Sequence, residues 1–89
     1  SALNLMSFLT VGEDEVRAWT ITNGTAASRA AGAVHSDIER GFIRAEIVTY
    51  DDLMAAGGLP SAKKAGNFRS EGRDYVMQDG DVVNYLFSV

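Results

Sequence analysis

The chain has few residues that could perform chemistry, and the most informative is its single histidine, His35. It has no cysteine, which excludes a thiolate metal site, a disulfide and a cysteine nucleophile. A zinc or iron centre with two imidazole ligands is excluded unless two chains share the metal. A Ser-His-carboxylate triad would have to use the adjacent Ser36, which lacks the G-x-S-x-G turn that exposes a nucleophilic serine. We therefore expect neither a metal site nor a catalytic residue on this chain.

Motifs for binding nucleotides or calcium are also absent from the sequence. No G-x-x-x-x-G-K-[ST] segment occurs, and no G-x-G-x-x-G follows a predicted strand, so no phosphate-cradling loop is expected. The segment Asp79-Gly80-Asp81 has the composition of a calcium loop but lacks the ligand spacing and the terminal glutamate of such loops. It predicts a turn. We expect no nucleotide cofactor on this chain.

His35 allows two interpretations. Its ring could hydrogen-bond to the backbone and fix the loop in which it lies. Alternatively it could lie at the surface and stack on, or hydrogen-bond to, an unpaired nucleotide, as imidazoles do in the recognition of single-stranded RNA. Arg40 and Arg44 follow closely enough in the sequence to contact the RNA backbone. These three residues are therefore candidates for binding nucleic acid.

A second basic segment gives a weaker indication of the same kind. Residues 63–73 contain four basic residues and one acidic residue, Glu71, so the local charge is +3 (4 − 1). The four basic residues are Lys63, Lys64, Arg69 and Arg73. The alternative interpretation is an ordinary solvated surface. The whole chain carries twelve acidic and eight basic residues, a net charge of −4, which argues against a general polyanion binder.

Length and composition predict one compact domain over residues 1–89. The start at Ser1-Ala2, without a methionine, suggests a piece of a longer protein. No apolar stretch approaches the roughly 18 residues that span a bilayer, so no membrane contact is expected. The absence of cysteine favours a cytoplasmic location.

Hydrophobic periodicity predicts the order strand, strand, helix, strand, helical segment, strand, strand. Thr25 should cap an alanine-rich helix, and Ser36 should cap a single turn that Gly41 ends in a left-handed conformation. Asp51 and Asp52 suit the start of a further helix. The predicted strands are 3–11, 16–21, 42–50, 74–77 and 82–89, and the predicted helices are 26–34, 36–41, 51–56 and 61–66.

Strands that flank one principal helix predict an α+β fold with a mixed sheet packed against that helix. Among small folds, the β-grasp (ubiquitin-like) domain fits this order best.

Several spaced motifs, in this order, make the chain resemble the C-terminal domain of the YchF family of Obg-like ATPases. The resemblance covers nearly the whole chain, and its chief departure is the segment 57–63, where loops vary freely. The motifs are Phe8–Gly12, Glu15–Ile21, Ala30–Gly32, His35–Asp37, Gly41–Glu46, Tyr50–Leu53, Gly72–Val76 and Asp79–Val82.

The resemblance implies a TGS-type domain, a β-grasp module also found in threonyl-tRNA synthetases and RelA/SpoT enzymes. It further implies a parent protein with a P-loop G domain that binds ATP, or GTP, with magnesium and prefers ATP, so that the catalytic residues lie outside this chain. In RelA-type members the His-Ser/Thr-Asp segment can approach the acceptor end of tRNA. That similarity adds Ser36 and Asp37 to His35 as candidate contacts.

We therefore expect a non-catalytic regulatory and docking module that helps a ribosome-associated ATPase to engage ribosomes or RNA and packs against its G domain. One alternative is an intramolecular scaffold on the G domain alone. Another is a ubiquitin-like module that offers its sheet face or an edge strand to a protein. RNA binding predicts steep salt dependence, whereas protein docking predicts sensitivity to apolar changes such as Leu86→Ala.

Overall fold

The computed structural model describes residues 4–11 and 16–88. This part of the chain contains five strands and four helices. The strands are β1 (Leu5–Val11), β2 (Val16–Thr22), β3 (Phe42–Thr49), β4 (Arg69–Glu71) and β5 (Asp81–Phe87). The helices are α1 (Ala27–Val34), α2 (Ser36–Arg40), α3 (Tyr50–Ala56) and α4 (Leu59–Lys64). The predicted Gly12–Glu15 connection between β1 and β2 lies outside the described residues.

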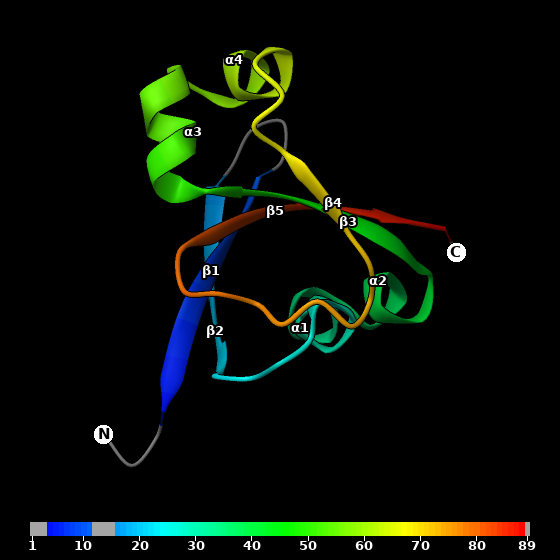
Figure 1. Cartoon of the computed structure of the whole chain (residues 1–89). Helices are drawn as coiled ribbons and strands as arrows, with labels where there is room; N and C mark the ends of the chain where they lie inside the picture. The colour runs from blue at the N-terminus through cyan, green and yellow to red at the C-terminus, as the bar shows by residue number, and fades with distance from the viewer. Residues whose placement is uncertain (1–3, 12–15, 89) are drawn as a thin grey trace.

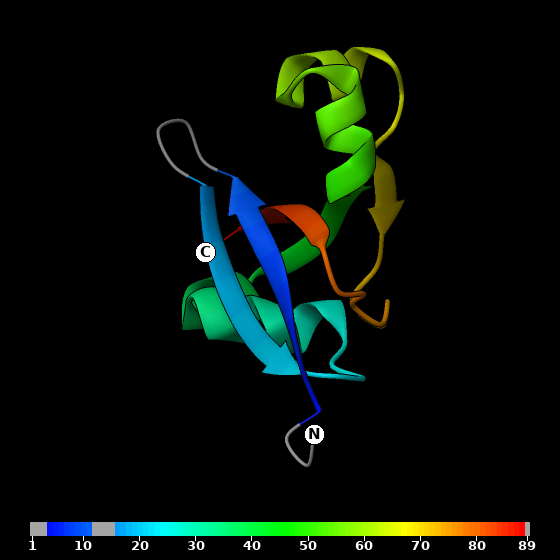
Figure 2. The same cartoon turned by 90° about the vertical axis from the view of Figure 1, so that its left-hand side faces the viewer.

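The strands form one mixed sheet in the order β2-β1-β5-β3-β4 (Figure 1). Only the central β1–β5 pair is parallel, and the other neighbouring pairs are antiparallel. Helices α1 and α2 lie on one side of the sheet, and α3 and α4 lie on the other (Figures 1 and 2). The predicted α+β fold, a β-grasp sheet packed against one principal helix, is confirmed.

The main core lies between the sheet and α1. Phe8, Ile47 and Val83 come from three neighbouring strands and are fully buried. Helix α1 meets them with three buried alanines, Ala27, Ala30 and Ala31. Because these side chains are short, the helix backbone can approach the sheet closely, and the larger side chains of the strands fill the layer between them.

The start of α1 differs from the prediction. Ala26, not Thr25, occupies the N-cap position, and no side chain caps the helix. The Thr25 hydroxyl instead donates to the carbonyl of Thr22, which stabilises the turn before the helix. The first backbone N–H groups of α1 therefore need other acceptors.

A strand predicted over Asp74–Met77 is not formed. The fourth strand is β4, which pairs with β3 over Arg69–Glu71, and Val76 makes only an isolated bridge with Ala26. Residues 73–75 have another role, because the carbonyls of Arg73 and Tyr75 accept from the first N–H groups of α1, at 3.2 and 2.7 Å. This segment provides the cap that the sequence pattern predicted at Thr25.

The carboxylate of Asp81 holds this segment against the start of β5. Asp81 is 2% exposed, and its Oδ2 accepts from the Tyr75 hydroxyl at 2.8 Å and from the Gln78 backbone N–H at 3.0 Å. Burial, together with the hydrogen bond to Asp81, raises the pKa of Tyr75 to about 12. Burial also raises the pKa of Tyr85, whose hydroxyl donates to the carbonyl of Ala27.

Gly41 ends α2, but not in the left-handed conformation that was predicted. Its φ is −97° and its ψ is 14°, a region open to other residues. The need for glycine is spatial, because a Cβ here would overlap the carbonyl oxygen of Ser88 and lie 2.8 Å from its carbon. The two backbones are joined by a hydrogen bond from the Ser88 N–H to the Gly41 carbonyl, 2.9 Å long.

Replacing Gly41 with alanine should lower the free energy of unfolding by about 1–3 kcal/mol, because the new methyl group would overlap rigid backbone. Gly72→Ala is the matched control, since a Cβ at that position meets nothing within 4 Å and the backbone is not left-handed. It should change the free energy by less than about 0.5 kcal/mol. Urea denaturation measures the free energy of unfolding of both variants. An equal decrease in Gly41→Ala and Gly72→Ala would contradict the explanation that Gly41 is needed for lack of space.

The raised pKa of Tyr75 predicts the direction of an alkaline effect. Below pH 10 the phenol is protonated in both folded and unfolded states, and its contribution to stability is complete. As the pH rises from 10 towards 12, the unfolded chain loses this proton before the folded chain does, so the free energy of unfolding should fall. Urea denaturation between pH 8 and 12 should show a smaller decline in Tyr75→Phe than in the wild type. An identical decline would contradict the assignment.

Candidate functional site

His35 lies in extended backbone between α1 and α2, where it is the N-cap of α2. Its Nδ1 accepts from the Asp37 backbone N–H at 3.0 Å, so the predicted cap, Ser36, is wrong by one residue. Histidine is not among the usual N-cap residues, which is why the sequence pattern favoured the serine. The ring is nevertheless 61% exposed. An accepting Nδ1 requires the proton on Nε2, which leaves a donor for another group.

The carboxylate of Asp37 lies between the imidazole and a guanidinium. Its Oδ1 accepts from Arg40, one turn later on α2, and its Oδ2 is 3.8 Å from His35 Nδ1. The Asp37–Arg40 ion pair is exposed to solvent, so it contributes little to the free energy of unfolding. It does offset much of the positive charge that Arg40 would otherwise present. Ser36 is exposed in the first turn of the same helix.

Arg44 lies two residues into β3, beyond an irregularity in the pairing between Phe42 and Arg44. It stands opposite Leu86 of β5 and is exposed. Arg73, from the loop after β4, reaches the same end of β3. Its guanidinium donates to the Phe42 carbonyl at 3.2 Å and lies 5.5 Å from the centre of the Phe42 ring.

Four of these residues, His35, Ser36, Asp37 and Arg40, lie on or beside α2. Arg44 points to the other side of the sheet, because it alternates with the core residue Ala45 and shares its face with Glu46, which pairs with Lys63 of α4. We name the region where α2 meets β3 the α2–β3 corner, and its members are His35, Ser36, Asp37, Arg40, Arg44 and Arg73.

The sequence predicted the first five of these residues as a group, but it placed Arg73 with the basic segment 63–73. The contact between Arg73 and Phe42 joins residues that are 31 positions apart, so no local sequence pattern predicts it. The corner thus has three arginines around the start of β3, with Arg40 on the α2 side of the sheet and Arg44 on the α4 side.

The other members of the basic segment are dispersed. Lys63 and Lys64 lie in the last turn of α4, where Lys63 Nζ is 3.7 Å from the Glu46 carboxylate. Arg69, on β4, is 3.4 Å from the Glu71 carboxylate and donates to the Tyr75 hydroxyl at 3.0 Å. The four cations therefore do not share one element.

The pKa of Arg69 reflects this local environment. Burial alone would lower it, but electrostatic attraction and hydrogen bonding with Tyr75 and Glu71 raise the pKa above its ordinary value. The guanidinium therefore stays charged, and its hydrogen bond to Tyr75 joins β4 to the loop that follows.

In residues 4–11 and 16–88, no three or more histidine, cysteine, aspartate or glutamate side chains come together as potential metal ligands. Within the same residues no helix has the length and apolar character needed to cross a bilayer. The segment Asp79-Gly80-Asp81 forms the turn into β5, where the Asp79 carboxylate accepts from the backbone N–H of Ser7.

Comparison with known proteins adds relatives of high similarity. The "Ribosome-binding ATPase YchF" of Bacillus subtilis (strain 168) is 56% identical over 89 residues, which are 100% of this chain and 24% of that protein. "Obg-like ATPase 1" of Rattus norvegicus is 49% identical over 88 residues, 99% of this chain and 22% of that protein. The chain therefore spans about a quarter of the length of these relatives.

Structure and family comparisons agree with these relatives. The solved structure of the Schizosaccharomyces pombe YchF GTPase superposes with a TM-score of 0.87 at 44% identity, covering 96% of this chain and 22% of that one. The family model YchF-GTPase_C, described as a protein of unknown function (DUF933), matches residues 5–88. The α2–β3 corner and the sheet that supports it thus belong to a known module, and the chain is a member of the YchF GTPase C-terminal domain family.

Proposed function

We propose that residues 1–89 form a single TGS-like domain, and that it acts as a non-catalytic docking module of a cytosolic, ribosome-associated P-loop ATPase. Two relatives that match 100% and 98% of the chain are named ribosome-binding ATPases, which supports the ribosome as the partner. The sequence contains no P-loop, which supports a role outside catalysis. ATP or GTP, with magnesium, would bind in the G domain of the parent protein.

The observation that carries this proposal is the position of three arginines around the start of β3, with Arg40 on the α2 side of the sheet, Arg73 beside Phe42 and Arg44 exposed on the opposite face. An exposed imidazole with a free donor lies beside them in the chain, so the corner offers contacts for both a phosphate and a base. Arg44 is the strongest phosphate ligand of the set. Arg40 is paired with Asp37 and Arg73 is engaged with Phe42, whereas Arg44 lies on an exposed strand position opposite an apolar residue.

A specific feature also favours a second candidate function, packing against the G domain of the same protein or against another protein. The β1–β2 hairpin presents a sheet face, on the side away from α1, whose described residues carry no charge. Its exposed members include Leu5 and Val16, which are 51% and 65% exposed. The register places these side chains on that face: Leu5, Ser7, Leu9, Val11, Val16, Ala18, Thr20 and Thr22. Such a face suits protein contact and offers nothing to phosphate.

The proposal of RNA contact is tested by the salt dependence of binding. The 89-residue chain should bind a single-stranded acceptor-end RNA more weakly as salt rises, and Arg44→Ala should reduce the slope of log K against log salt by about one. Arg17→Ala is the matched control, because Arg17 is an exposed arginine on β2, where it stacks on Trp19. It should leave the slope unchanged. Fluorescence anisotropy measures both, and equal effects of the two substitutions would contradict a specific corner site.

The cap and the recognition roles of His35 can be separated by two substitutions. His35→Ala removes the acceptor for the Asp37 N–H and should lower the free energy of unfolding by about 1 kcal/mol. His35→Asn keeps an N-cap acceptor and should leave stability nearly unchanged. If the imidazole contacts RNA, both variants should bind RNA more weakly. If His35→Asn bound RNA as tightly as the wild type does, the role of His35 would be only that of the N-cap of α2, and RNA recognition by its imidazole would be contradicted.

A further inference from the structure

The turn that follows β2 contains Asn23-Gly24, the one place in the chain where glycine follows asparagine. The Thr25 N–H donates to the Thr22 carbonyl at 3.2 Å, so Asn23 and Gly24 are the two central residues of a β-turn. Gly24 has a φ of 90°, which glycine adopts without strain, and a Cβ at this position would meet nothing within 4 Å. Both central residues are exposed, so water reaches the peptide bond between them.

An asparagine that is followed by glycine is open to a reaction within the chain. The backbone nitrogen of the glycine bonds to the side-chain carbonyl carbon of the asparagine and loses its proton to solvent, and the amide nitrogen takes up a proton and leaves as ammonia. The product is a cyclic succinimide. Water then opens this ring at one of its two carbonyls and yields aspartate or isoaspartate. Glycine favours the first step because no side chain shields its nitrogen.

The Gly24 nitrogen is available for this attack. Gly24 lies beyond β2, which ends at Thr22, and its N–H donates to no backbone carbonyl in the part of the chain that the structure describes. A nitrogen whose proton is not held by such an acceptor loses that proton to solvent more readily. The fold therefore does not oppose the first step at Asn23.

The other junction of this kind, Asp79-Gly80, is protected by the fold. Aspartate followed by glycine can form the same succinimide, with water as the leaving group in place of ammonia. Here the Gly80 N–H donates to the Ser7 carbonyl at 2.9 Å, and the Asp79 carboxylate accepts from the Ser7 N–H at 2.9 Å. Both reacting groups are therefore bound to β1, and the succinimide should form much more slowly than at Asn23.

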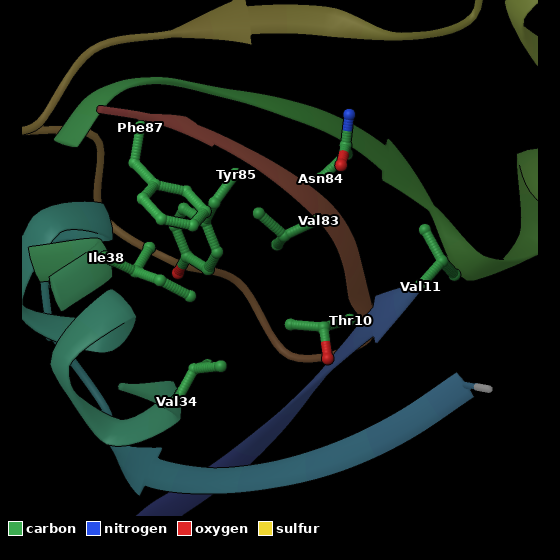
Figure 3. A pocket seen from close by; sticks show the side chains of 8 residues that line it. All are labelled: Thr10, Val11, Val34, Ile38, Val83, Asn84, Tyr85 and Phe87. Atoms are coloured by element: carbon green, nitrogen blue, oxygen red, sulfur yellow. The ribbon is translucent and has the colours of Figure 1, made fainter. Parts of the chain in front are cut away.

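The remaining asparagines are less suited to the reaction, because each is followed by a large side chain that hinders approach to the attacking nitrogen. Figure 3 shows one of them, Asn84, on β5, where its amide donates to the Glu46 carboxylate at 3.0 Å and its backbone is paired with β3. The three pairs are Asn4-Leu5, Asn67-Phe68 and Asn84-Tyr85.

One contact restrains Asn23, and it comes from Asn4 at the start of the described chain. The Asn23 side-chain amide donates to Asn4 Oδ1 at 2.8 Å, and the Asn23 backbone N–H donates to the Asn4 carbonyl at 2.9 Å. The first of these hydrogen bonds holds the nitrogen that must leave as ammonia. It therefore slows the reaction without engaging the nitrogen of Gly24 that attacks.

We propose that Asn23 is a site of spontaneous deamidation, which converts it to isoaspartate or aspartate, and that the Asn4 side chain sets the rate. The product has a carboxylate where the amide donated, so two acceptors face each other at Asn4 and the hydrogen bond is lost. The net charge changes from −4 to −5 (−4 − 1). The new charge follows Thr22, which lies on the uncharged face of the β1–β2 hairpin. The reaction needs neither RNA nor a protein partner.

The test is to incubate the folded 89-residue chain in mildly alkaline buffer and to analyse tryptic fragments by mass spectrometry. Fragment 18–29 contains Asn23 and no other asparagine, glutamine or aspartate, so a gain of one dalton there reports on Asn23 alone. The fragment should also accept methyl groups from a protein isoaspartate methyltransferase. Fragment 74–89, which contains Asp79-Gly80, should accept far fewer.

Two substitutions at residue 4 test the restraint. Asn4→Ala removes the acceptor of the Asn23 amide and should speed deamidation by about fivefold, the factor that a typical hydrogen bond is worth. Asn4→Asp is the matched control, because its carboxylate keeps an acceptor in place, and it should deamidate at close to the wild-type rate. Both variants keep the backbone bond from Asn23 to residue 4.

Three results would overturn the proposal. Fragment 18–29 could gain no mass from the folded chain while it does so from the chain unfolded in guanidinium chloride, which would show that the fold protects Asn23. Fragment 74–89 could be methylated as fast as fragment 18–29, which would contradict protection by Ser7. Asn4→Ala and Asn4→Asp could deamidate at equal rates, which would remove Asn4 from control of the reaction.

Discussion

The buried carboxylate of Asp81 connects the two halves of the fold. It accepts from Tyr75 and from the backbone of Gln78, and so fixes the segment between β4 and β5. That segment in turn supplies the carbonyls that cap α1, and the N–H of Gly80 within it donates to β1 through the Ser7 carbonyl. The principal helix and the central parallel pair are thus positioned from one buried side chain, and β4 is linked to it through the hydrogen bond from Arg69 to Tyr75. A polar group that is removed from water must stay hydrogen-bonded.

The sequence predicts most of the sheet because its strands alternate in polarity or carry strand-forming residues, and it predicts α1 from its alanines. It fails where tertiary contacts replace local signals. Strand β4 has no apolar alternation and forms only because β3 offers it an edge. Residues 74–77 look like a strand because of Tyr75 and Val76, yet their backbone serves the helix start. Caps made by distant carbonyls, as at Ala27, leave no trace in local sequence.

The candidate site shows the same difference between features that local sequence predicts and features that depend on tertiary contacts. The segment from His35 to Arg44 is contiguous, so sequence reasoning could group it, and one of its two interpretations of His35, a ring bonded to the backbone, describes the observed geometry. Arg73 joins the corner through Phe42, far away in the chain, and that contact is visible only once β3 and β4 are paired. Ion pairs also change the value of each cation: Asp37 offsets Arg40, whereas Arg44 stands apart from the described pairs.

The close approach of Gly41 and Ser88 decides where a label can be attached to this molecule. Because Ser88 is hydrogen-bonded beside the end of α2, an affinity tag or fluorophore joined at the carboxyl end would emerge next to the arginines of the corner. The described chain begins at the far end of the β1–β2 hairpin, well away from that surface (Figure 1). Immobilisation or labelling through the amino end therefore leaves the corner open to a ligand.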